Sequence, residues 1–353
     1  MRHHYLLLIS ALSLVACGGT PSTATTADRS IEDEEDEDSY VDEEPEDEEV
    51  SGGRGFVDEA LLRGVVLELG EATEVPGTGV TMRPPAGAQP MPFGAGFLAL
   101  RERVQVSVAV VVGDEAVLET IRTGGDPNAP APAAESQIEI AGQTGRLGRD
   151  LVRTQGGVLE RQWLLVHDGT RGLGIVATYE QARAEGYRGT IQEALSDVAW
   201  DREAVIDAAA ALGIDVGPVE GLELSPRSTA NVVLIEPGAD FPPEPGQVVL
   251  TVSPLPARVP EERAMGLCPQ LAARFLPAPE EAVVHEGDLA DGQLHGCERI
   301  AVAELPSGER VVTYLSLLFH EGTPILVTGS VAEDAQSTWR PRFTHAAQTV
   351  RIR

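Results

Sequence analysis

The chain contains no lysine, because all 26 of its basic residues are arginine. This absence excludes a P-loop lysine, a Schiff-base enzyme and a lysine general base. Positive charge is scarce altogether: 56 aspartates and glutamates give the chain a formal net charge of −30 at pH 7. Since an acidic surface repels phosphate backbones, we expect no nucleic-acid partner.

Catalytic motifs are also missing from the sequence. It has no GxSxG nucleophile elbow, no GxGxxG and no HExxH. Paired carboxylates cannot be singled out among so many acidic residues. We therefore predict no catalytic residue and no cofactor, and expect a protein that is not an enzyme; a hydrolase without a recognisable motif is an alternative.

Aromatic residues are few, with three Trp, five Tyr and seven Phe. Trp163 falls in an expected strand, and Trp200 and Trp339 fall in expected helices at the ends of the two halves of the chain. We expect these side chains to pack in the core rather than to form a platform for stacking sugars.

A short apolar run, Tyr5 to Val15, lies near the N-terminus. As a helix, eleven residues rise about 16 Å, which is too short to span a bilayer core of about 30 Å. The run is therefore typical of the apolar region of a signal peptide. No other segment has 18 apolar residues without a charge.

The Leu-Val-Ala-Cys sequence of Leu14–Cys17 closes this run and precedes Gly18. It resembles the lipobox of bacterial lipoproteins. The resemblance implies that residues 1–16 are a signal peptide and that Cys17 carries a lipid anchor in the cell envelope. A glycine rather than an aspartate after Cys17 is similar to lipoproteins sent to an outer membrane. A plain secreted protein is the alternative.

An acidic segment follows the predicted anchor. Asp28 to Glu49 holds fifteen acidic residues and one basic residue. Such dense like charge with few apolar side chains cannot collapse into a core. We expect residues 17–55 to form a disordered tether between the membrane and the rest of the chain; diffuse cation binding is the alternative.

The remaining sequence contains an internal repeat, which predicts two domains, at residues 56–212 and 213–353. The hairpins around His167-Asp168-Gly169 and His320-Glu321-Gly322 match best. The stretch 79–85 also corresponds in order to 232–238. Residues 200–212 look helical, and 213–221 form the expected boundary.

Apolar periodicity predicts the elements of each half. In the first half we expect strands at 104–112, 136–140, 145–152, 159–166 and 174–179 and helices at 114–122 and 190–200. In the second half we expect strands at 232–235, 247–252, 282–285, 298–304, 310–319 and 325–330 and helices at 260–276 and 337–350.

This order of elements resembles the PsbP-like fold over residues 64–201 and 221–353. The resemblance implies an α+β class, with two tandem antiparallel sheets that are each covered by helices. Well-known members of that family bind other proteins and do not catalyse reactions. No functional residues carry over, because no motif matches.

Cys268 and Cys297 form an even pair outside the cytoplasm if the lipobox is correct, so we expect a disulfide. Free thiols, or a metal or redox pair, are alternatives. His295 and His285 could meet across a hairpin, but zinc needs further ligands at defined spacing, so we predict no metal site. The His-acid-Gly triplets at 167, 285 and 320 are interpreted as turns.

Together these features predict a membrane-anchored envelope lipoprotein that acts as a non-catalytic binding or assembly component. Its expected partners are the membrane, through the lipid, and another envelope protein. The alternative is a carrier of a small hydrophobic ligand, for which a deep apolar pocket would be the evidence.

Overall fold

The computed structural model describes residues 66–353, apart from 114, 124–128, 130, 155, 240–242, 245, 256–257, 290–291 and 306. The predicted signal peptide, Cys17 and the acidic tether lie outside the described residues.

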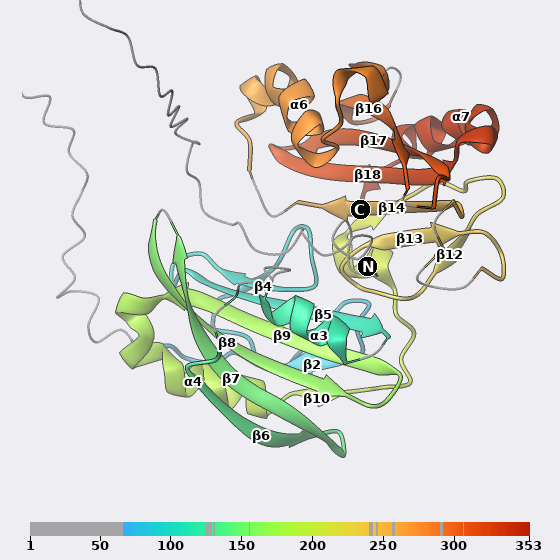
Figure 1. Cartoon of the computed structure of the whole chain (residues 1–353). Helices are drawn as coiled ribbons and strands as arrows, with labels where there is room; N and C mark the ends of the chain where they lie inside the picture. Colours follow the sequence, from blue (N-terminus) through green and yellow to red (C-terminus); the bar gives the residue numbers. More distant parts are fainter. Residues whose placement is uncertain are drawn as a thin grey trace, which may run out of the picture.

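Two seven-stranded antiparallel sheets make up most of the described chain (Figure 1). Their strand orders are β3-β4-β5-β9-β8-β7-β6 and β12-β13-β14-β18-β17-β16-β15. Adding nine to each strand number of the first order gives the second order, so the two sheets share one topology. The α+β class predicted from the sequence is confirmed.

The first unit consists of the first sheet with helices α3 and α4. Its strands are β3 (Gln89–Pro90), β4 (Gly96–Ala99), β5 (Val104–Val112), β6 (Ala134–Ile140), β7 (Gln143–Thr154), β8 (Gly157–His167) and β9 (Arg171–Glu180). Its helices are α3 (Ala116–Thr123), the 3-10 turn η1 (Gln181–Arg183) and α4 (Ala184–Ser196).

The second unit consists of the second sheet with helices α6 and α7. Its strands are β12 (Glu223–Ser225), β13 (Val232–Ile235), β14 (Val249–Pro254), β15 (Val283–Asp288), β16 (His295–Glu304), β17 (Arg310–His320) and β18 (Thr323–Ala332). Its helices are α6 (Glu261–Phe275), η2 (Glu280–Ala282), η3 (Glu333–Ala335) and α7 (Gln336–Gln348).

Two small sheets complete the fold. One joins β1 (Thr73–Val75), β2 (Val80–Met82) and β10 (Ala199–Trp200), and the other joins β11 (Ile214–Asp215) to β19 (Arg351–Ile352). The short helix α5 (Ala208–Leu212) lies between them in the chain, capped by the Asp207 carboxylate, which accepts a hydrogen bond from the Ala210 amide.

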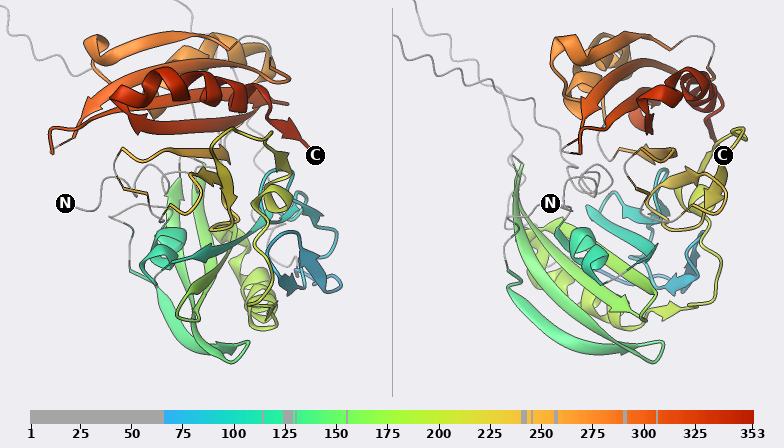
Figure 2. Two further views of the ribbon diagram at one scale, coloured as in Figure 1. Left: turned by 90° about the vertical axis from the view of Figure 1, so that its right-hand side faces the viewer. Right: turned by 45° about the vertical axis from the view of Figure 1, so that its right-hand side comes forward.

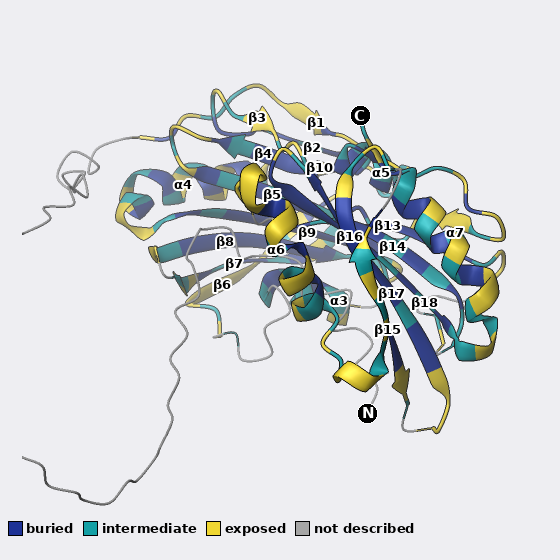
Figure 3. Cartoon of the chain, turned by 90° about the horizontal axis from the view of Figure 1, so that it is seen from above, coloured by how far each residue is buried: buried dark blue, intermediate teal, exposed yellow. Residues whose placement is uncertain are grey.

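Each large sheet is covered by a helix on both faces, because alternate residues of a strand point to opposite sides. On β8, Leu164 packs in the core that includes α4, while Trp163 packs in the cluster under α3. On β17, Leu318 packs in the core with α7, while Leu317 packs with α6. Figure 3 shows the buried residues gathered in the strands and the exposed ones on the outer sides of the helices.

The structure corrects several expected elements. Helix α4 begins at Ala184, ahead of the expected 190, and residues 199–200 form a strand, so Trp200 is not in a helix. The counterpart of β13 in the first unit is β4, not the stretch 79–85, because β2 belongs to a separate sheet. The expected helix at 200–212 is limited to α5.

The two units are joined by a segment of the second that extends the first sheet. β4 pairs only with residues 104–107 of β5. Beyond that point, Thr229 Oγ1 accepts a hydrogen bond from the Val110 amide at 2.9 Å, and the Arg227 carbonyl accepts one from the Val112 amide at 2.7 Å. Residues 227–229 thus satisfy the open edge of β5. Figure 2 shows the second unit (orange to red) lying above the first (blue to green) in both views.

Candidate functional site

We call the face of each sheet that carries α3 or α6 its outer face. The two outer faces are covered to different extents. In the second unit α6 has 15 residues, whereas in the first unit α3 has 8. Helix α3 packs on β8 and β9 (Figure 1), and it approaches closely because a side chain at Gly174 would lie 2.8 Å from Ile121 Cγ2. The face of β5 next to α3 is left partly open: Gln105, Ser107 and Ala109 are only half-buried.

The open part of this face forms the floor of a cleft between the units, of about 280 Å³. Both units contribute apolar walls. The first unit supplies Met91, Phe93, Leu98, Ala109, Ile121 and Val176, and the second supplies Thr229, Pro254, Leu255 and Thr323.

Polar groups lie at a few places in this cleft. Gln105 donates a hydrogen bond from Nε2 to Ser107 Oγ at 3.1 Å on the floor. Arg258 is exposed, and it is the one ionisable residue among the described residues that line the cleft. The site can therefore take an apolar group and offer hydrogen bonds and one positive charge around it.

One wall of the cleft is held by an aromatic contact between the units. Phe93 meets the ring of His320 edge-on, with ring centroids 5.9 Å apart and an interplanar angle of 82°. Phe93 also packs against the core of the second unit. The position of the loop that carries Phe93 thus depends on both units.

The inner core of the first unit holds a buried carboxylate with permanent partners. Arg188 donates to both oxygens of Glu160 at 2.8 Å, and Tyr179 donates to Oε1 at 3.0 Å. Burial raises the pKa of Glu160, but the hydrogen bonds from Arg188 and Tyr179 outweigh it, so its pKa lies below the usual value. Burial raises the pKa of Tyr179.

The second unit has a related arrangement in which a histidine takes the place of the arginine. Tyr314 donates to Glu298 Oε2 at 3.0 Å, and His285 Nε2 lies 2.8 Å from Glu298 Oε1. A register shift in β15 next to Val284 accompanies this placement of His285 on the strand. Burial raises the pKa of Tyr314, which also contacts Ser316 Oγ at 2.6 Å. The network is enclosed, since Ser316 is fully buried.

Cys268 on α6 and Cys297 on β16 lie at disulfide distance, with Cα atoms 5.9 Å apart. Both side chains are buried in the cluster between α6 and the second sheet. The pair therefore connects α6 to the face that it covers. Cys17 cannot be placed, since it lies outside the described residues.

Two of the three His-acid-Gly triplets lie at hairpin turns, as the sequence indicated. The third, at His285, lies within strand β15, so the expectation of a turn there was wrong. Asp168 accepts backbone hydrogen bonds from Thr170 and Arg171 at 2.9 and 2.7 Å. Burial raises the pKa of Asp168, and these bonds outweigh it, so its pKa is lowered. At the other hairpin, Glu321 and Gly322 have φ values of 46° and 76°, as a two-residue turn requires.

His285 and His295 do not meet. In the β15–β16 pairing His285 lies opposite Ile300, five residues along the strand from His295. No cluster of three or more metal-ligating side chains occurs within the described part of the chain.

All three tryptophans are buried, which confirms the expected core packing. Trp163 lies under α3 with the guanidinium groups of Arg122 and Arg146 about 6 Å from its ring. Trp339 stacks on Phe343 of α7. The residues of the cleft, by contrast, were not found from the sequence. They come from both units, and only the folded structure brings them together.

No protein-family model matches the chain, and no curated protein sequence matches it. Among the described residues, no helix combines the length and the apolar character needed to cross a membrane.

Solved structures similar to the chain include a cyanobacterial PsbP protein from Synechocystis sp. PCC 6803, which has 14% identity and a TM-score of 0.23 over 40% of this chain and 92% of that one. They also include the type VI secretion immunity protein TplEi of Pseudomonas aeruginosa, with 11% identity and a TM-score of 0.32 over 83% and 99% of the two chains. A chain of the Tle4–Tli4 complex has 12% identity and a TM-score of 0.31 over 78% and 95%. We base no functional argument on similarities at this level.

Proposed function

We propose that this chain is a non-catalytic binding component of a bacterial envelope, anchored through Cys17, and that its partner is a protein that inserts apolar side chains into the cleft between the two units. The observation that carries the proposal is this cleft, whose walls come from both units.

The cleft is at the small end of the range of ligand sites, and its size suits side chains of a protein. Sites for drug-sized molecules usually have about 300–1,000 Å³, and this cleft has about 280 Å³. One or two apolar side chains fit such a volume. Each one contributes about 1.5–3 kcal/mol when it is fully buried, so two would form the centre of a modest interface.

The polar groups next to the apolar floor suit the border of a protein interface. Gln105, Ser107 and Arg258 can each bond to the backbone or side chains of a partner. The predicted anchor and tether add to this proposal, because a tethered protein meets a membrane partner at high local concentration.

A photo-cross-linking amino acid at position 109 tests the proposal in the native envelope. Ala109 is half-buried on the floor of the cleft, and Ala134 is exposed on β6, at the far edge of the same sheet. We expect one stoichiometric protein adduct from position 109 and none of that mass from position 134, measured by mass spectrometry.

Binding of the purified partner then measures the contribution of the cleft. Ala109→Arg places a charged, bulky side chain on the apolar floor and should weaken binding at least tenfold, whereas Ala134→Arg should leave it unchanged. Equal binding by both variants, with both folded as wild type, would contradict the proposal. A cross-link from position 109 to a small molecule alone would support the carrier alternative.

A further inference from the structure

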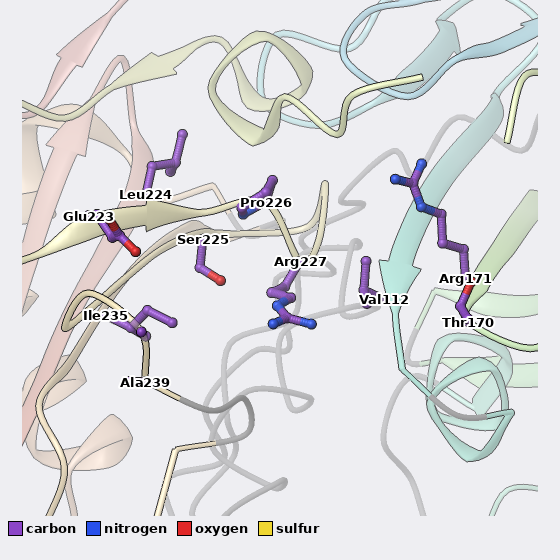
Figure 4. Close-up of a pocket in the computed structure, with 11 residues that line it drawn as sticks. Val112, Thr170, Arg171, Glu223, Leu224, Ser225, Pro226, Arg227, Ile235 and Ala239 are labelled. Carbon is purple, nitrogen blue, oxygen red and sulfur yellow. The ribbon is translucent and has the colours of Figure 1, made fainter. Parts of the chain in front are cut away.

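A second hollow lies on the other side of the segment that joins the units. It has a volume of about 580 Å³, and Figure 4 shows the residues that line it. The second unit supplies Leu224, Arg227 and Ile235, and the first supplies Val112 and Arg171.

Arg227 is held firmly at its backbone, and its guanidinium has no ionic partner among the residues that the structure describes. Its amide donates to the Ser225 carbonyl at 2.8 Å, and its carbonyl accepts from the Val112 amide at 2.7 Å. Its side chain is half-buried, and no described residue forms a hydrogen bond or an ion pair with the guanidinium. Figure 4 shows this group within the hollow, between Ser225 and Val112.

Arg171 adds a second positive charge to the wall. Its guanidinium donates to the carbonyls of Arg202 and Ala204 at 2.6 and 2.8 Å, which are neutral groups. Figure 4 shows it directed away from Arg227, so Arg171 contributes to the electrostatic potential without direct contact. Glu223 is the one carboxylate among the described lining residues, and it is exposed, so water reduces its effect on a bound anion but does not remove it.

The hollow therefore combines a half-buried arginine with apolar side chains, in a chain whose net charge is −30. We infer that it is a binding site for a small organic anion that carries a single carboxylate beside an apolar portion. The carboxylate bonds to Arg227, and the apolar portion packs on Leu224, Ile235 and Val112. Since these residues come from both units, the bound anion contacts both.

Octanoate and its neutral counterpart octanamide test this site by titration calorimetry on the protein without its signal peptide. Octanoate should bind at least tenfold more tightly, because arginine bonds a charged carboxylate more strongly than a neutral amide. Arg227→Gln should remove this difference. Arg258→Gln, at the apolar cleft, should keep it.

Glu223→Gln gives a readout that does not depend on removing an arginine. It leaves Arg227 in place and should tighten octanoate binding without affecting octanamide. The inference is overturned if octanoate does not bind at about 1 mM, if both ligands bind equally, or if Arg258→Gln abolishes the preference and Arg227→Gln does not. The cross-linking result at position 109 is independent of each of these outcomes.

Discussion

The two units share one strand order but protect their outer faces in different ways. The second sheet is covered by the 15-residue α6, which Cys268 and Cys297 connect to β16. The first sheet is covered by the 8-residue α3, which ion pairs hold in place, including Arg122 to Asp150 at 3.4 Å. The position of the cleft is therefore not determined by the topology, which the two units share. It is determined by the length of the helix that covers the outer face.

The buried carboxylates on the inner faces extend this contrast. Glu160 faces two arginines, with Arg149 at 3.9 Å in addition to Arg188. Glu298 is instead contacted by His285 Nε2 at 2.8 Å and by the Tyr314 hydroxyl at 3.0 Å. Arginine guanidinium groups, which stay charged, support the first carboxylate, whereas an imidazole and a tyrosine hydroxyl contact the second.

The largest expected effect comes from removing the cysteine pair. Cys268→Ser should lower the free energy of unfolding of the second unit by about 3–4 kcal/mol, because the two cysteines are 29 positions apart in the sequence and the closed loop restricts the unfolded chain. Amide hydrogen exchange should show the loss in β16 and β17 and leave β7 and β8 unchanged. As a control, the wild type treated with a reductant should lose the same protection from exchange in β16 and β17. Equal protection with and without reductant would contradict the prediction.

Glu160→Gln should lower the stability of the first unit by about 2 kcal/mol, because it removes two charge-assisted hydrogen bonds. Glu298→Gln should cost the second unit only about 1 kcal/mol, since the amide can still accept from Tyr314. Urea unfolding with exchange read from β8 and β17 separates the two effects. A larger loss in the second unit would reverse the comparison.

The pH dependence of stability provides a sharper form of this test. The folded pKa of Glu160 lies below its unfolded value. Its contribution is therefore fully present above about pH 4.3 and is lost as the pH falls through the lowered pKa. Wild type should lose stability in this acidic range relative to Glu160→Gln, and parallel pH profiles would exclude the effect.

Thr229→Val should weaken the junction between the units by about 1–2 kcal/mol, since the buried Val110 amide loses its acceptor. The unfolding transitions of the two units should then separate, whereas Thr229→Ser should keep them together. Calorimetry on the three proteins measures this, and coincident transitions in Thr229→Val would show that the bond does not couple the units.

The smallest effects are expected from glycines in the covering helices. A side chain at Gly189 of α4 or Gly266 of α6 would meet no atom within 4 Å. Each change to alanine should therefore stabilise its own unit by about 0.5–1 kcal/mol. Thermal unfolding measures the gain in stability. A lower stability of either variant would mean that the added methyl group meets a neighbouring atom at that position.

The strands with regular apolar patterns could be predicted from the sequence, and so could the hairpins. β5 has a valine at almost every other position, β8 has the apolar stretch Trp163–Val166, and the turns at 168–169 and 321–322 have acid-glycine pairs. Helices α6 and α7 were predicted within two residues of their bounds. These features depend on local sequence, which is why sequence alone could identify them.

Other features depend on contacts between distant residues. β4 is four residues in a glycine-rich stretch, so it has no pattern, and its pairing with β5 defines it. The start of α4 is obscured by Gly186 and Gly189. The cleft and the hollow could not be predicted, because both depend on how residues 227–229 place the two units against each other. The limits of the two domains and the lipid at Cys17 stay predictions.

The segment 227–229 also affects how the chain can be divided. A fragment that ends at residue 212 would separate the first sheet from the hydrogen-bond partners of Val110 and Val112. It would present a bare strand edge to its neighbours, and open edges promote pairing between molecules. The natural boundary in the sequence is therefore a poor place to cut the gene: the first half would be expected to aggregate, and recombination at that point would be disfavoured.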